Sequence, residues 1–524
     1  MLGSLTSGRA GLLNWLESQL GLQIPTVSFT ARMVPYLSCL RECDDGSRFY
    51  SASLAKDDFG VASTLLSWRD TWYEAGWEGG GFSADGSRRL IDMAEVEKAA
   101  AERVPLGLGQ RVRRLLAALD GNQLGVVVTL LDPPEIFPTV WQQLFDTLGA
   151  KTETYELMPK CRGDSDLAVL QRALLDEDRE GGEIELQGDG TVVVLRDGSP
   201  QLSAPWIARF AHRQLDRGGK VAVLASDDGA TLDDALADAG FPRLGFSDTS
   251  YWRPAFQVLP LVLELLWRPL DPNVLQQFLT HPMGPIPKDI RGRLADRVLR
   301  EPGIGGEGWK TTLSRALDQA TKHLDEKAGA ERRKGLIERI EFWLNGERFD
   351  AEQGVEVEVL RERVQAVSRW LNAARNAESD DGLREVYKAA LGQADELDRT
   401  IDRLATTGAT ILNRESVRRL VEAVRGTGTS RPGRHRQCEA GVTELLRANS
   451  PAAFLQPVVQ VVWWGCDSVK MTSQYPWSSA EQTLLAAHGA ELVPVSAQLE
   501  WQAKSWLRPL LSATERLVLV LHDN

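Results

Sequence analysis

The sequence has no long hydrophobic run and few cysteines. Its longest apolar stretches, at 258–263 and 517–521, are far shorter than the roughly 20 residues that a membrane-spanning helix needs. The N-terminus lacks the basic start, apolar segment and small-residue cleavage site of a secretory signal. The five cysteines are odd in number and scattered, which predicts reduced thiols rather than a disulfide framework. We therefore expect a soluble, cytoplasmic protein that has no contact with a membrane.

The residue patterns of common hydrolases are also missing. The six histidines do not cluster, and the sequence contains no GxSxG nucleophile elbow and no HExxH zinc motif. The nearest approach to a nuclease ExK motif is 325–327, in a polar helical stretch where a solvated surface is the simpler interpretation. Cys39 and Cys43 have helical spacing, but no second Cys or His pair accompanies them, so burial is favoured over metal binding. We expect no catalytic residue and no metal site.

Positive charge is in the minority. Sixty Lys and Arg residues against 73 Asp and Glu give a net charge of −13. The molecule as a whole therefore repels polyanions, and any contact with nucleic acid must be a local basic region. A length of 524 residues, of which 43% are hydrophobic, predicts roughly three or four folding units of an ordinary globular protein.

The hydrophobic pattern predicts an α/β protein interrupted by helices. Short apolar runs followed by Gly, Asp or Pro and then by a helical pattern are typical of strands in a parallel sheet. We expect such strands at 23–29, 124–131, 191–195, 221–224, 458–464 and 516–521. Helical spacing of apolar residues predicts helices at 8–21, 61–77, 94–119, 330–344 and 355–374. The segment 256–425 has almost no alternating pattern, which indicates a large helical insertion.

The first residues of the chain are similar to a phosphate-binding loop. Gly3 and Gly8 have the spacing of the G-x-x-x-x-G-K-[ST] motif, and a helix follows whose backbone N–H groups could hold an anion. Arg9 replaces the lysine that contacts the phosphates, and Ala10 replaces the hydroxyl that holds Mg²⁺. Asp132 ends an apolar run, as an acidic partner of Mg²⁺ would, although Asp is also common where a strand meets a turn. We interpret these residues as a degenerate nucleotide site or a helix-entry turn; no cofactor is expected, with ATP and Mg²⁺ as the alternative.

A basic segment follows the last predicted helix of the insertion. That helix carries several arginines, and the glycine-rich segment 426–436 adds three arginines, one histidine and no acid. Local positive charge with small residues predicts contact with the phosphate backbone of DNA or RNA, against the alternative of a solvated loop. The candidate DNA-binding residues are Arg418, Arg419, Arg425, Arg431, Arg434 and Arg436.

Several sequence blocks occur in a characteristic order along most of the chain. The first is GRAGLLNWLESQLGL at 8–22, followed by further blocks at 51–58 and 65–77. The second comprises WRP, LWRPLDP, FLTHP and PGIGG within 252–306, and the third VVWWGC and YPWS within 461–478. In their order and spacing these blocks resemble the AddB-type inactivated superfamily-one helicase subunits of bacterial helicase–nuclease complexes.

The resemblance implies two RecA-like, P-loop NTPase-like parallel-sheet domains with large helical insertions. It also implies that an UvrD-like partner drives translocation, which agrees with the departures at Arg9 and Ala10. Arg508 and Arg516 lie where an active helicase has a phosphate-sensing arginine, but the flanking residues differ and we assign neither that role. The expected boundaries are 1–215 for the first RecA-like domain with an insertion at about 60–120, 216–260 for the start of the second, 261–450 for its helical insertion, and 451–524 for its remainder.

The function that these features imply is a non-catalytic DNA-binding subunit that guides or splits duplex DNA for a partner helicase or nuclease. The setting would be DNA repair, recombination or defence against foreign DNA. Family members usually continue into a PD-(D/E)XK nuclease domain, which we do not find before Asn524, so cleavage is expected from another chain or the sequence is a fragment. The alternatives are a self-sufficient ATP-dependent DNA helicase and a protein scaffold without DNA contact.

Overall fold

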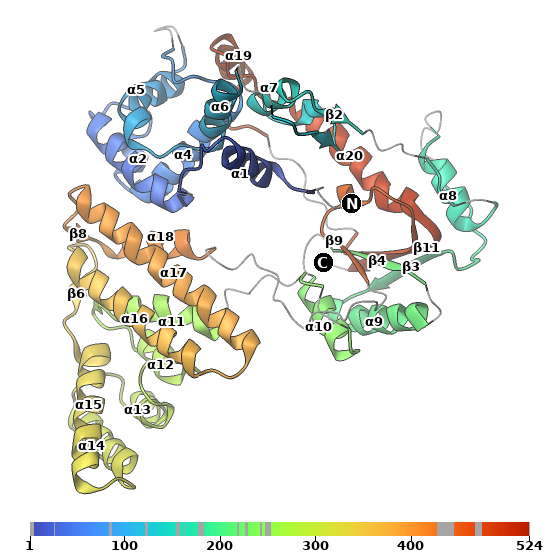
Figure 1. Cartoon of the computed structure of the whole chain (residues 1–524). Helices are drawn as coiled ribbons and strands as arrows, with labels where there is room; N and C mark the ends of the chain where they lie inside the picture. The colour runs from blue at the N-terminus through green and yellow to red at the C-terminus, as the bar shows by residue number, and fades with distance from the viewer. Residues whose placement is uncertain are drawn as a thin grey trace.

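The computed structural model shows a helical half and an α/β half (Figure 1). It describes residues 5–25, 27–82, 86–120, 124–153, 158–161, 163–176, 183–216, 219–225, 229–241, 244–246, 253–426, 445–466 and 474–522. In these ranges no helix combines the length and the apolar character that crossing a membrane requires.

The α/β half is built on one five-stranded parallel sheet. Its strands have the order β3-β11-β10-β4-β9, and Val462 at the centre pairs with Val223 on one side and Val518 on the other. The strands are β3 Val192–Asp197, β4 Val221–Ala225, β9 Leu446–Ala448, β10 Val458–Trp464 and β11 Ala513–His522. The strands predicted at 191–195, 221–224, 458–464 and 516–521 are thus confirmed. Because β3 belongs to this sheet, the sheet begins earlier in the chain than the expected domain boundary at 215/216.

Helices cover both faces of this sheet, which explains why its strands read as continuous apolar runs. One face packs against α9 (Pro200–Asp216) and α10 (Ala230–Asp238), and the other against α8 (Asp166–Leu174) and α20 (Val495–Ser512) (Figure 1). Alternate residues of each strand enter the two cores, so Val223 faces α9 while Leu224 faces the opposite side. The α/β prediction is therefore confirmed for this half of the molecule.

The N-terminal part is mainly helical. Its helices are α1 Arg9–Gln19, α2 Phe29–Cys43, α3 Ser51–Leu54, α4 Asp58–Glu74, α5 Arg88–Arg103, α6 Leu108–Leu119 and α7 Thr139–Thr147. A short 3-10 helix, Pro134–Ile136, precedes α7. Helices were expected at 8–21, 61–77 and 94–119; the last is two helices, because Pro105 and Gly107 interrupt it between α5 and α6.

The strands expected in this part are much shorter than predicted. In the region 124–131 only β1, Thr129–Leu130, is a strand, and it pairs in parallel with β2, Lys151–Thr152. The strand expected at 23–29 is wrong within its described residues, because the chain there is irregular and α2 begins at Phe29. Ser28 accepts a hydrogen bond from the backbone N–H of Ala31 at 3.1 Å, which makes it the N-cap of α2 rather than part of a strand.

The predicted helical insertion is confirmed. Its helices are α11 Pro254–Glu264, α12 Pro272–Thr280, α13 Lys288–Arg300, α14 Glu307–Thr321, α15 Glu326–Ile340, α16 Val357–Ala377, α17 Asp381–Thr406 and α18 Arg414–Val424, with a π-helical turn at Glu341–Asn345. Two pairs of two-residue strands brace it: parallel β5 Trp267–Arg268 with β6 Phe349–Asp350, and antiparallel β7 Val355–Glu356 with β8 Ile411–Leu412. The insertion and helices α2, α4 and α5 share one hydrophobic core.

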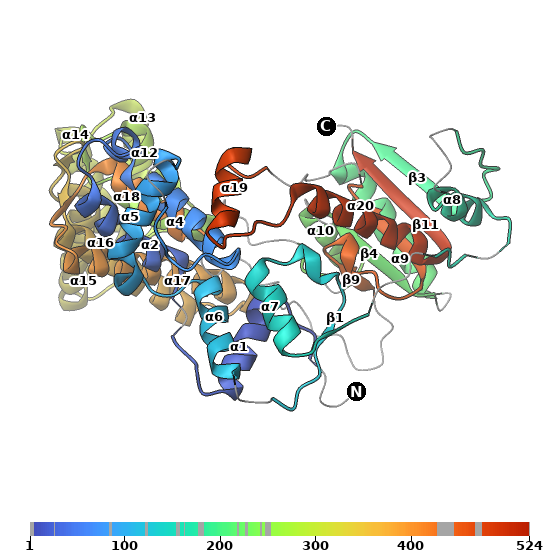
Figure 2. The same ribbon diagram turned by 90° about the horizontal axis from the view of Figure 1, so that it is seen from above.

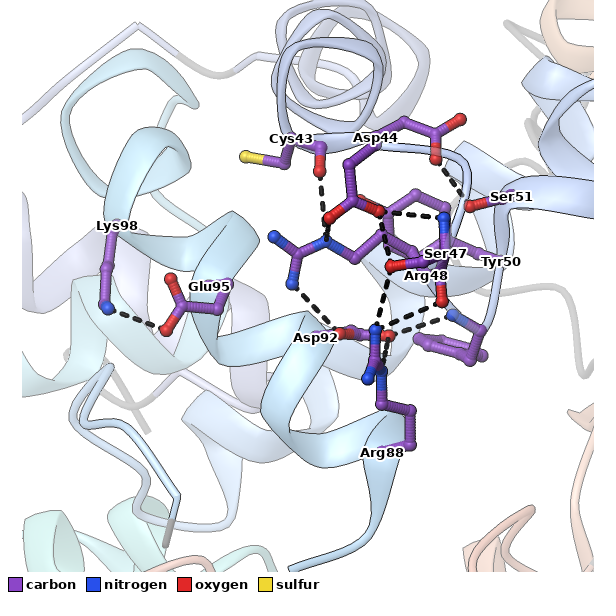
Figure 3. Close-up of polar contacts among 12 residues, drawn as sticks. Cys43, Asp44, Ser47, Arg48, Tyr50, Ser51, Arg88, Asp92, Glu95 and Lys98 are labelled. Atoms are coloured by element: carbon purple, nitrogen blue, oxygen red, sulfur yellow. Dashed lines mark hydrogen bonds and ion pairs between the residues drawn. The ribbon is translucent and has the colours of Figure 1, made fainter. Parts of the chain in front are cut away.

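Buried ion pairs fix the N-terminal helices. Asp92 on α5 is 1% exposed and accepts hydrogen bonds from Arg48 at 3.0 Å, Arg88 at 3.1 Å and the backbone N–H of Phe49 at 2.9 Å (Figure 3). Three donors compensate the buried carboxylate, so the loop that follows α2 is held against α5. Removing one partner would leave an uncompensated buried charge, which destabilises the fold.

A C-terminal segment returns to the helical half. Helix α19, Ser479–Ala487, lies between the helical body and the sheet (Figure 2). Trp477 just before it packs on Trp68 and Trp72, with ring centroids 5.7 and 5.8 Å apart. Glu481 on α19 pairs with Arg89 on α5. In sequence this segment lies between strands β10 and β11 of the sheet, but it packs against the helical half. It therefore joins the two halves.

Candidate functional site

A cavity of about 840 Å³ lies where the N-terminal part, which carries helices α1 to α7, meets the parallel sheet. Its walls come from the start of α1, the end of α4, the turn before α7, the segment after β9, and α20. The volume is within the range of small-molecule sites. Its lining includes the aromatic residues Phe137, Trp463, Tyr475, Trp501 and Trp506 and the charged residues Arg9, Glu74, Asp132 and Glu491.

Two of the residues predicted from the phosphate-loop pattern line this cavity together. Arg9 is the first residue of α1, with Gly8 as its N-cap in extended conformation, and Asp132 follows strand β1 by two residues. A helix N-terminus and the carboxyl end of a strand are the positions where nucleotide sites form in parallel α/β proteins. Ala10 is exposed in the first turn of α1, and Gly3 lies outside the described residues.

Arg9 already has an anionic partner. Its Nη1 atom lies 3.0 Å from Oε2 of Glu74 on α4, and its guanidinium lies 5.8 Å from the ring centroid of Trp141. Burial raises the pKa of Glu74, and Arg9 opposes that shift. A phosphate would therefore have to displace the Glu74 carboxylate before Arg9 could bind it.

Asp132 is likewise paired within the protein. Its Oδ1 accepts a hydrogen bond from Nη2 of Arg508 at 3.2 Å and from Nε1 of Trp501 at 3.3 Å. Arg508 is buried and also donates from Nη1 to the carbonyl of Ala452 at 2.8 Å. The carboxylate that would hold Mg²⁺ in a working site thus serves as a contact between the N-terminal part and α20.

The sequence pattern did not point to Glu74 or to a structural role for Arg508. Glu74 is 65 positions from Arg9, and Arg508 is 376 positions from Asp132. Neither residue belongs to a motif that includes its partner, so only the fold brings each pair together. The arrangement neutralises the charges that a triphosphate and its metal would use.

Cys39 and Cys43 are placed unfavourably for metal binding. Cys39 is buried and Cys43 half-buried on α2, and burial raises the pKa of both thiols, that of Cys39 to about 11. Thiols with raised pKa values are poor metal ligands, because a metal binds the thiolate. Across the part of the chain that is described, no group of three or more His, Cys, Asp or Glu side chains is arranged to hold a metal ion.

The arginines of α18 also have carboxylate partners. Arg418 pairs with Glu415 at 3.2 Å, and Arg419 pairs with Asp57 at 3.0 Å and with Glu422 at 3.1 Å. Positive charge on this helix is therefore balanced locally, which the arginine run alone did not indicate.

The contact recorded for Arg425 is made by its backbone rather than by its side chain. It is the C-cap of α18, and its carbonyl accepts a hydrogen bond from Gln393 at 2.6 Å. Arg431, Arg434 and Arg436 lie outside the described residues.

Comparison with known proteins assigns the chain to no family. No protein-family model matches the sequence, and no curated protein has significant similarity to it.

Proposed function

We propose that this chain is a non-catalytic, helicase-like DNA-binding subunit. It guides or splits duplex DNA for a partner helicase or nuclease in DNA repair, recombination or defence against foreign DNA. In this proposal the five-stranded sheet is the core of a second RecA-like domain, and α1, β1, β2 and α7 belong to a reduced first one. The cavity then corresponds to a nucleotide site between the two domains.

The observation that carries the proposal is the pairing of charges in this cavity. Arg9 and Asp132 line the cavity as remnants of a nucleotide site would, but Glu74 and Arg508 neutralise them. A self-sufficient helicase would need a free cation for the phosphates and a free carboxylate for Mg²⁺. This arrangement therefore supports a cavity that is placed like a nucleotide site but does not turn over ATP.

The DNA-binding part of the proposal rests on the basic segment after α18. Salt-dependent binding of the purified chain to a forked DNA duplex would test it. The variant is the triple change Arg431→Ala, Arg434→Ala, Arg436→Ala. A matched control is Arg300→Ala, Arg315→Ala, Lys322→Ala, which removes three exposed positive charges from the helical insertion.

We expect tight, salt-sensitive binding by the native chain and by the control. In the triple-arginine variant the slope of log affinity against log salt should fall by about two to three units. No binding at low salt would favour a protein scaffold instead. ATP-stimulated strand separation by this chain alone would contradict its non-catalytic character.

A further inference from the structure

Helix α9 presents an outward face that combines apolar, aromatic and basic side chains. Its buried side, formed by Ala204, Ile207, Ala208 and Ala211, packs on the sheet. At 100° per residue, the opposite side carries Leu202, Trp206, Arg209 and Arg213 in one strip. Leu202 is 67% exposed, both arginines are exposed, and Trp206 is half-buried.

Two aromatic rings on this helix form a parallel stack. The ring centroids of Trp206 and Phe210, one turn apart, are 5.5 Å from each other, and their planes differ by only 5°. The Arg516 guanidinium lies 6.0 Å from the Phe210 centroid. Both rings contact the core of the sheet yet stay half-buried, so the stack extends from the core to the surface beside the exposed Leu202.

The charge on α9 is mainly positive. Its charged residues are Arg209, Arg213 and, at its C-terminal end, Asp216, in a chain of net charge −13. Arg209 donates from Nε to the carbonyl of Pro205 in its own helix, and among the side chains that the structure describes neither Arg209 nor Arg213 has a carboxylate partner. This contrasts with α18, where Arg418 and Arg419 are paired with acids.

We propose that the outward face of α9 binds single-stranded nucleic acid, with a base stacking at Trp206 and Phe210 and backbone phosphates pairing with Arg209 and Arg213. Aromatic rings between free cations are the usual chemistry of strand binding without sequence preference. An unpaired strand fits better than a duplex, because only an unstacked base can offer its face to a side chain. The two exposed arginines beside the stacked rings favour a polyanion over a protein partner. This inference rests on the proposed DNA-binding function and assigns a surface to it.

Binding of a labelled oligothymidylate of about 20 nucleotides to the full chain tests the proposal across a salt series. Arg209→Gln with Arg213→Gln removes two exposed charges without touching the core, and the matched control is Arg300→Gln with Arg315→Gln, two exposed arginines of the helical insertion. We expect about tenfold or greater weakening for the α9 pair at low salt, with a salt slope lower by about one to two units. The control pair should bind like the native chain.

Substitutions of Trp206 separate the contribution of base stacking from that of the two arginines. Trp206→Leu should weaken binding by about fivefold or more, whereas Trp206→Phe, which keeps a ring, should retain most of the affinity. Unchanged thermal unfolding of the arginine variants keeps the test valid even where Trp206→Leu destabilises the fold.

Two results would overturn the assignment of α9. Native affinity in the Arg209 and Arg213 variant, while the native chain binds the strand in a salt-sensitive way, would remove α9 from the interface but leave the proposed function standing. Failure of the native chain to bind either the single strand or forked DNA at low salt would reject both together.

Discussion

Glu74 decides whether Arg9 is available to an anion. Replacing it by Gln removes the carboxylate that lies 3.0 Å from the guanidinium while keeping the side-chain shape. Because hydrogen bonds to charged groups contribute about 1.5–3 kcal/mol, we expect Glu74→Gln to increase pyrophosphate affinity by about tenfold or more in calorimetric titration. Glu491→Gln is the control, since Glu491 lines the same cavity but does not pair with Arg9. Equal gains in both variants would show that only the net charge of the cavity matters.

Anion binding at Arg9 should depend on pH through the protonation of Glu74. Burial raises the pKa of Glu74, so this carboxyl takes up a proton at a higher pH than an ordinary Glu. A protonated Glu74 no longer attracts Arg9, so anion binding by the native chain should strengthen as the pH falls through this pKa. Glu74→Gln should lack that component of the pH dependence.

Single residues of the site were only partly predictable from the sequence. The spacing of Gly8 and Arg9 before a helix is local information, and Asp132 marks the end of an apolar run, so both ends of the cavity could be predicted. Glu74 and Arg508 could not, because a pairing across 65 or 376 positions leaves no periodic signal. The acids that balance Arg418 and Arg419 include Asp57, which is equally remote in sequence.

At the scale of elements, α19 acts as a strap between the halves. Glu481 accepts hydrogen bonds from Arg89, Ser87 and Ser478, which lower its pKa to about 2. A carboxyl with a lowered pKa in the fold stabilises that fold above its unfolded pKa, and this contribution is lost as the pH falls. We expect the protection factors of the α19 amides, taken relative to the intrinsic exchange rate at each pH, to fall between about pH 4.5 and pH 2, before those of the central sheet fall.

A matched pair of variants tests the origin of that acid sensitivity. Glu481→Gln should accelerate exchange in α19 already at pH 7, since the charge on Arg89 loses its partner. Glu500→Gln, which alters an exposed pair with Lys504 on α20, should leave α19 unchanged. Protection of α19 that stays the same in Glu481→Gln would mean that the packing of Trp477 alone holds the strap.

The strands show why some elements were predicted well and others poorly. Strands β4 and β10 are buried on both faces, so their sequences are continuous apolar runs that local reading detects. The region around β1 is also apolar, yet only Thr129 and Leu130 pair with β2. Strand formation depends on the available partner, which is a property of the fold rather than of the segment.

At the scale of the whole molecule, a small set of polar contacts between described residues joins the halves at the cavity. Arg508 on α20 joins Asp132, while Thr139 donates from its hydroxyl to the carbonyl of Glu491 at 2.8 Å. The backbone N–H of Glu491 also donates to the carbonyl of Ala75 at 2.8 Å. A cavity bordered by these contacts makes the relative position of the halves sensitive to each of them, and to any ligand that occupies it.

Among these contacts, we expect the loss of the Arg508 side chain to lower the stability of the fold most. Arg508→Met removes the donors to Asp132 and to the Ala452 carbonyl, leaving two buried or half-buried acceptors with fewer partners. We expect a loss of about 1–3 kcal/mol and an earlier onset of unfolding in calorimetry, with proteolysis appearing first in the segment that carries Asp132. Lys504→Met on the same helix breaks only the exposed pair with Glu500, so its stability should change by less than about 0.5 kcal/mol. If the two variants unfold alike, the pairing of Asp132 with Arg508 does not hold the halves together, and that role falls to the contacts of Glu491 and to the α19 strap.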